Sequence, residues 1–159
     1  MDNGDWSAAG RHATEALSLA ARWMPAEHRD TLIVLARIAL AQSELEAARS
    51  RLEEALELTL GLGETFGLAQ VLRSTAGLAA ARGDLQQAAR LVGASERLRE
   101  TTLLSEGVEL DLAGFADSIK AKMADEWYDE EVAAGRSLAR SGVLDLAQSV
   151  LASGSSSAS

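Results

Sequence analysis

The apolar positions along this chain are filled mainly by alanine and leucine, which are strong helix formers. Hydrophobic residues make up 47% of the 159 residues, but aromatic residues only 4%. The β-branched and aromatic residues are too scattered to give the alternating runs that half-buried strands need. The pattern therefore predicts an all-α protein without a sheet, with helices at about 6–23, 26–42, 44–60, 64–82 and 84–101.

A short turn opens the first, third and fifth of these helices, and the same pattern follows each turn. The turns are Gly4-Asp5-Trp6, Ser43-Glu44-Leu45 and Gly83-Asp84-Leu85. An alanine follows five positions after the first turn residue, an apolar residue nine positions after it, and a small residue twelve positions after it. These residues are Ala9, Ala48 and Ala88, then Ala13, Leu52 and Val92, then Ala16, Ala55 and Ser95. The copies are 39 and 40 residues apart, a constant period that is typical of a helical repeat protein.

Small residues at fixed helical spacing allow two helix backbones to approach closely. We therefore expect antiparallel helix pairs that stack on one another as an α-solenoid. Ser43 with Glu46, and Asp84 with Gln87, have the spacing of a capping box and are predicted to cap the helices that follow them. The remaining predicted boundary residues are Pro25 in a first helical turn, and Gly61 and Gly63 between two repeats.

The segments GDLQQAARLVGAS and SELEAARSRLEEALEL, with their turn and spaced alanines, resemble tetratricopeptide (TPR) repeats. The period is longer than the roughly 34 residues of a standard TPR and is closer to the TPR-like arrays of bacterial regulators. The resemblance implies TPR-like helical repeats over residues 1–102.

The pattern changes after residue 102. The sequence LLSEGVELDLAGFADSIKAKM predicts a loop and then a helix at about 109–123, with Leu110, Phe115, Ile119 and Met123 on one side. Two shorter helices follow in DEWYDEEVAAGRSL and SGVLDLAQSVL, the second capped by Ser141. We assign residues 103–151 to capping helices of the same domain and residues 152–159 to a flexible polar tail.

A further resemblance involves three segments, which are the helix RGDLQQAARLVGASERLRE, the segment ADEWYDEEVAAGRSL and the final apolar helix. Together they resemble the C-terminal part of the TPR-like sensor region of LuxR-type and SARP-type (MalT-like) ATPase-linked bacterial transcriptional regulators. The likeness covers about residues 64–151. It implies that the ATPase core and the DNA-binding helix-turn-helix lie outside this chain, which would be a fragment of a longer regulator. No phosphate-binding G-x-x-x-x-G-K-[ST] loop occurs in it.

The chain carries 15 basic and 24 acidic residues, a net charge of -9. Such a surface repels phosphate backbones, so we expect no direct contact with nucleic acid. The absence of cysteine excludes disulfides and thiolate metal sites. No apolar run approaches the roughly 20 residues of a membrane-spanning helix. We expect a soluble, cytoplasmic protein.

The sequence predicts no catalytic, metal or cofactor site. His12 and His28 lack the spacing that places two ligands on one helix face, and we expect them at the surface or at helix caps. Without a Gly-x-Ser-x-Gly motif or a cysteine nucleophile, the chain is not expected to be an enzyme. A hydrolase that relies on isolated carboxylates is the remaining catalytic hypothesis. The acidic run Asp125, Glu126, Asp129, Glu130 and Glu131 is expected to form a solvated helix face, and Trp6, Trp23 and Trp127 are expected to pack in the core.

The first helix of each predicted pair would line a concave groove. Projecting the repeat onto these helices selects as groove residues Asp30, Ile33, Arg37 and Leu40, followed by Gln70, Arg73, Gly77 and Ala80. Arg37 and Arg73 are the most informative members, because arginine forks match carboxylates and phosphates and would hold an acidic peptide or an anionic ligand. The alternative is that both are ordinary exposed charges on a helix.

Two functions follow from these observations. The first is a signal-relay segment of a transcriptional regulator, whose partner is another protein, a peptide or the remaining domains of the same regulator. The second is a free-standing TPR adaptor that holds a partner peptide in its groove. The first helix would lack the helix that precedes it in a complete repeat, so we also expect a homodimer through this helix, which a charge at Ala13 would disrupt.

Overall fold

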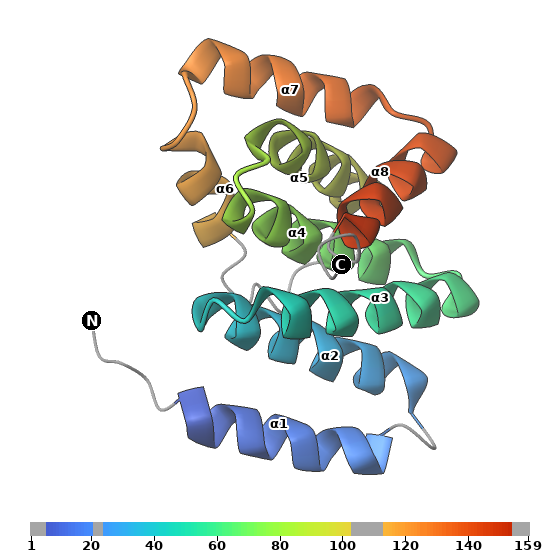
Figure 1. Ribbon diagram of the computed structural model, residues 1–159. Helices are drawn as coiled ribbons and strands as arrows, with labels where there is room; N and C mark the ends of the chain where they lie inside the picture. Colours follow the sequence, from blue (N-terminus) through green and yellow to red (C-terminus); the bar gives the residue numbers. More distant parts are fainter. Residues whose placement is uncertain (1–5, 21–23, 103–112, 154–159) are drawn as a thin grey trace.

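The computed structural model describes residues 6–20, 24–102 and 113–153. These residues form eight α-helices and no strand (Figure 1). The helices are α1 (Trp6–Ala20), α2 (Pro25–Ala41), α3 (Leu45–Leu62), α4 (Thr65–Ala81), α5 (Leu85–Glu100), α6 (Ala113–Lys120), α7 (Asp125–Ser137) and α8 (Arg140–Ala152). The all-α prediction is thus confirmed for this part of the chain. The predicted Gly4-Asp5 turn, Trp23, Leu110 and most of the predicted tail lie outside the described residues.

The first five helices pack in chain order. The most extensive contacts join α2 with α3 and α4 with α5, and α2 also lies beside α4. Figure 1 shows α1 at one end of the molecule and α7 at the other, where α7 packs on α5. Helix α8 contacts both α4 and α5, so the last two helices return to the third repeat. None of the helices in the described segments combines the length and the apolar character needed to cross a membrane.

The repeated small and apolar positions form the centre of the core. In α3, Ala48, Leu52 and Ala55 are completely buried. At the equivalent positions of α5, Ala88 and Val92 are completely buried and Ser95 is nearly so. The sequence repeat therefore marks the residues through which the second and third copies pack.

The turns between α2 and α3 and between α4 and α5 have the same hydrogen bonds. The amide of Glu44 donates to the carbonyl of Ala39, and the amide of Asp84 donates to that of Ala79, as in a Schellman motif. Ser43 and Gly83 are the left-handed residues of the two turns, with φ of 61° and 87°. The prediction that Ser43 caps α3 is therefore wrong, because Ser43 belongs to the end of α2 and Glu44 is the N-cap without a side-chain bond.

Other predicted boundaries have mixed outcomes. Asp84 caps α5 as predicted, since its carboxylate accepts a hydrogen bond from the Gln87 amide at 3.1 Å. Pro25 is the first residue of α2, also as predicted. Gly63 ends α3 in a left-handed conformation, but Gly61 lies inside that helix. Ser141 does not cap α8, which begins one residue earlier.

Candidate functional site

The eight predicted groove residues lie on α2 and α4. Asp30 is exposed, and Arg37, Leu40, Gln70 and Ala80 are half-buried. In contrast, Ile33, Arg73 and Gly77 are buried, so they do not line an open groove. The accessible polar residues of the predicted surface are Asp30, Arg37 and Gln70. Binding at these residues stays a prediction.

Helix α6 explains why Gly77 is covered. This helix packs on α4 and α5, and its Ile119 is completely buried. The ring of Phe115 lies directly over Gly77, where a Cβ atom would come within 2.9 Å of the ring. The guanidinium of Arg37 lies 5.7 Å from the centre of the same ring, within the range of a cation–π contact. One aromatic side chain of α6 thus contacts α4 and Arg37 of α2.

Arg73 is only 7% exposed, which excludes the alternative that it is an ordinary exposed charge. Its charge acts on Tyr128 of α7. Burial raises the pKa of the Tyr128 phenol, and the charge of Arg73 acts against that rise. Reversing the charge of Arg73 would place a carboxylate in the core, so such a variant would test folding rather than partner binding.

A buried arginine also binds the carboxylate of Asp30. Arg29 is 4% exposed and donates to the carboxylates of Asp30 and Glu64, the residue that precedes α4. Burial works to lower the pKa of Arg29, but the bonds to the two carboxylates outweigh it and the pKa is raised. Asp30 is therefore part of an ion-pair network that joins α2 to the start of α4.

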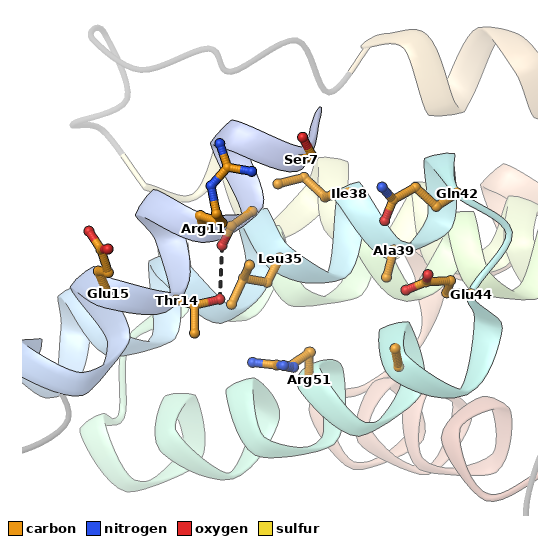
Figure 2. A pocket seen from close by; sticks show the side chains of 12 residues that line it. Ser7, Arg11, Thr14, Glu15, Leu35, Ile38, Ala39, Gln42, Glu44 and Arg51 are labelled. Carbon is orange, nitrogen blue, oxygen red and sulfur yellow. Dashed lines mark hydrogen bonds between the residues drawn. The ribbon is translucent and has the colours of Figure 1, made fainter. Parts of the chain in front are cut away.

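A concave region lies among α1, α2 and α3, with a volume of about 530 Å³ (Figure 2). Its floor is apolar and includes Leu35, Ile38 and Ala39 of α2. Figure 2 shows that Arg51 of α3 and Leu35 extend into the space between the helices. The lining also contains Arg11, Glu15 and Glu44, so charges of both signs surround the pocket. No sequence signal indicated this pocket, because its residues come from three helices and share no motif.

Several polar and aromatic residues differ from their predicted environments. His28 is buried, and its Nε2 lies 2.9 Å from Oε1 of Glu54. Trp127 is 42% exposed rather than part of the core. Glu131 is buried, unlike the other four members of the predicted acidic face. His12 is exposed as predicted. Within the described ranges, no three His, Asp or Glu side chains are grouped as a metal site requires.

Glu131 is buried because α5 supplies its hydrogen-bond donors. The side chains of Gln86 and Arg90 both donate to its carboxylate, and so does the indole of Trp127 on the same helix. Burial by itself would raise the pKa of Glu131, but these donors outweigh it and the pKa lies below its ordinary value. The carboxylate therefore joins α7 to α5.

The chain is similar to bacterial proteins that are provisionally named HTH-type transcriptional regulators. It is 32% identical over 152 residues to one from Mycobacterium bovis and, to the same extent, to one from Mycobacterium tuberculosis strain H37Rv. The alignment covers 93% of this chain but only 17% of each relative. The chain thus corresponds to about one sixth of the length of these regulators.

The chain matches no protein-family profile. No solved structure matches it at a significant level. The similarity therefore supports transcriptional regulation in general terms. The narrower resemblance to TPR-like sensor regions of LuxR-type and SARP-type regulators stays a prediction.

Proposed function

We propose that this chain is a protein-interaction or signal-relay segment of a bacterial transcriptional regulator, and that its repeats form a TPR-like array. The observation that carries this proposal is the alignment of 93% of the chain with HTH-type regulators. The segment acts through binding rather than catalysis. Its partner is a protein or peptide, or another part of the same regulator.

The packing of the helices supports an interaction role. In a helical repeat array, the first helix of each pair lines a shared surface that binds partners. Helices α2 and α4 are the first members of their pairs, and they lie side by side. Asp30 and Gln70 occupy equivalent positions on them, 40 residues apart. A partner surface on these two helices therefore has Asp30, Arg37 and Gln70 as accessible polar residues.

The contact of Phe115 with α4 and Arg37 also supports this location. It is an example of an aromatic side chain from a short helix bound on the α2–α4 surface. Arg37 is half-buried beside the ring, and its planar guanidinium matches the geometry of a partner's carboxylate. We propose that the partner contacts Arg37 next to α6.

The proposal is tested by introducing the substitution Arg37→Glu into the chromosomal gene of the source bacterium. Loss of the cation–π contact at this half-buried residue costs between about 0.5 and 2 kcal/mol, so the fold should survive. RNA sequencing then compares this strain with the wild type and with a gene deletion. We expect the substitution to change the same transcripts as the deletion.

The matched control is Lys122→Glu, which makes the same charge change at an exposed residue outside the α2–α4 surface. It should leave the transcripts as in the wild type. A deletion strain with unchanged transcripts under all growth conditions would contradict the regulatory role. If the deletion changes transcripts but Arg37→Glu does not, the partner does not bind beside α6.

A further inference from the structure

The face of α1 that carries the sequence repeat differs from its two equivalents. The repeat aligns Ala9, Ala13 and Ala16 of α1 with Ala48, Leu52 and Ala55 of α3, and with Ala88, Val92 and Ser95 of α5. The six residues of α3 and α5 are between 0% and 3% exposed. In α1, however, Ala9 and Ala16 are exposed and Ala13 is only half-buried. The same sequence pattern is therefore buried in α3 and α5 but accessible to solvent in α1.

The covered copies show which kind of helix fits this face. Helix α3 packs most extensively on α2, and α5 on α4. Both covering helices have 17 residues, and equivalent buried residues recur in them. Leu32, Ala36 and Ala39 of α2 correspond to Leu72, Ala76 and Ala79 of α4, and all six are at most 5% exposed. A leucine followed by alanines four and seven positions later is therefore the shared apolar stripe of the covering helix.

The other contact of α1 agrees with this assignment. Helix α1 packs on α2, which belongs to the next repeat, just as α3 packs on α4. Within the described residues, α2 is the main neighbour of α1, and none takes the place that α2 has for α3. The contact that α3 makes with α2, and α5 with α4, therefore has no counterpart for α1 among the described residues.

We propose that the Ala9–Ala13–Ala16 face of α1 is a docking surface for one amphipathic helix of the α2 and α4 kind. Its occupant is a helix of about 17 residues with a leucine and two alanines at positions i, i+4 and i+7. The leucine fills the space beside the alanines, which let the two backbones approach. A second copy of α1 fits less well, because contacts between alanines bury little apolar area.

The experiment uses the full chain and a synthetic peptide with the sequence of residues 25–41, the chain's own covering helix. Peptide binding is followed by NMR signals of the alanine methyl groups. We expect shifts at Ala9, Ala13 and Ala16 on peptide addition. Ala13→Glu should weaken binding by about tenfold or more, because the carboxylate would be buried without a partner.

Two controls separate docking from other effects. Thr14→Glu adds the same charge at an exposed position on a different side of α1 and should leave the affinity unchanged. A peptide with Asp at the position of Ala36 should not bind. Circular dichroism shows whether Ala13→Glu keeps the helicity and melting temperature of the wild type, as expected for a residue that is only half-buried.

Three results would overturn the proposal. The first is no binding at peptide concentrations of about 1 mM. The second is shifts at Ala48 and Ala55, which would mean that the peptide replaces α2 instead of covering α1. The third is a dimer in sedimentation that Ala13→Glu dissociates while the peptide does not bind, which would assign the face to a second copy. None of these results depends on the regulatory function.

Discussion

Ser43 and Gly83 occupy the same position in two copies of the repeat, and both adopt a left-handed backbone conformation. The turn requires this conformation because it brings the amides of the next residues to the last carbonyl groups of the preceding helix. Glycine adopts it without cost, whereas the Cβ atom of serine crowds the backbone. Ser43 therefore has a strained backbone conformation that the turn requires, and a substitution can test the cost of this strain.

Replacing Ser43→Gly should stabilise the protein by about 1 kcal/mol, because the strain of the left-handed residue is removed. The change is measured by urea unfolding followed by circular dichroism. The matched control is Ser50→Gly, at an exposed position inside α3, where glycine should destabilise by about 0.5 kcal/mol. A loss of stability with Ser43→Gly would mean that the serine side chain contributes more than the strain costs.

At the scale of elements, the crossing of α5 and α7 depends on two glycines. A Cβ atom on Gly135 would lie 1.9 Å from the carbonyl oxygen of Arg90, and one on Gly93 would lie 2.0 Å from that of Val132. Each glycine thus contacts the backbone of the opposite helix. Backbone cannot move aside as a flexible side chain can, so the two helices would have to separate to accept even an alanine.

We expect Gly135→Ala to destabilise the protein by about 3 kcal/mol, the upper part of the range for overpacked cores. Gly61→Ala is the matched control, because it lies in α3 with no atom near its absent Cβ. There the better helix propensity of alanine should add about 0.5–1 kcal/mol. Thermal unfolding of both variants measures the difference. Equal stabilities would show that α7 is not held at this distance in solution.

The helices were predictable from sequence because their signals are local. The five predicted repeat helices begin and end within three residues of the observed ones. In contrast, α6 covers Gly77 through contacts between residues 38 positions apart in the chain, and no periodic pattern reports such contacts. The burial of Arg73 was missed for the same reason. The capping pattern at Ser43 was misleading, because serine occurs both at helix N-caps and, more rarely, in the left-handed position that glycine prefers.

At the scale of the whole molecule, charged contacts join the C-terminal helices to the repeats. Arg90 and Gln86 of α5 hold Glu131 of α7, and Arg136 at the other end of α7 donates to Glu100 of α5. The hydrogen bond from Arg136 lowers the pKa of Glu100. Both carboxylates are ionised more readily in the folded protein than their ordinary pKa of 4.5 implies. The attachment of α7 is therefore sensitive to acid.

The sign of this dependence follows from linkage. A carboxylate whose pKa is lower in the folded state than in the unfolded state stabilises the fold fully above the unfolded pKa, and that contribution is lost as pH falls through the folded pKa. Glu131 should therefore contribute its full stabilisation above about pH 5 and progressively less below its ordinary pKa of 4.5. The buried Glu131 should have a larger effect than Glu100, which is exposed to solvent and screened.

Glu131→Gln tests this dependence, because glutamine keeps the shape of the side chain but cannot ionise. At pH 7 we expect the variant to be less stable than the wild type, since Arg90 loses its charged partner. The difference between the two melting temperatures should shrink as the pH falls below about 4.5, because protonation removes the same charge from the wild type. Glu126→Gln, at an exposed position of α7, is the control and should give no comparable pH-dependent difference. A difference between wild type and Glu131→Gln that stays constant from pH 7 into the acid range would show that the charge of Glu131 does not hold α7 on α5.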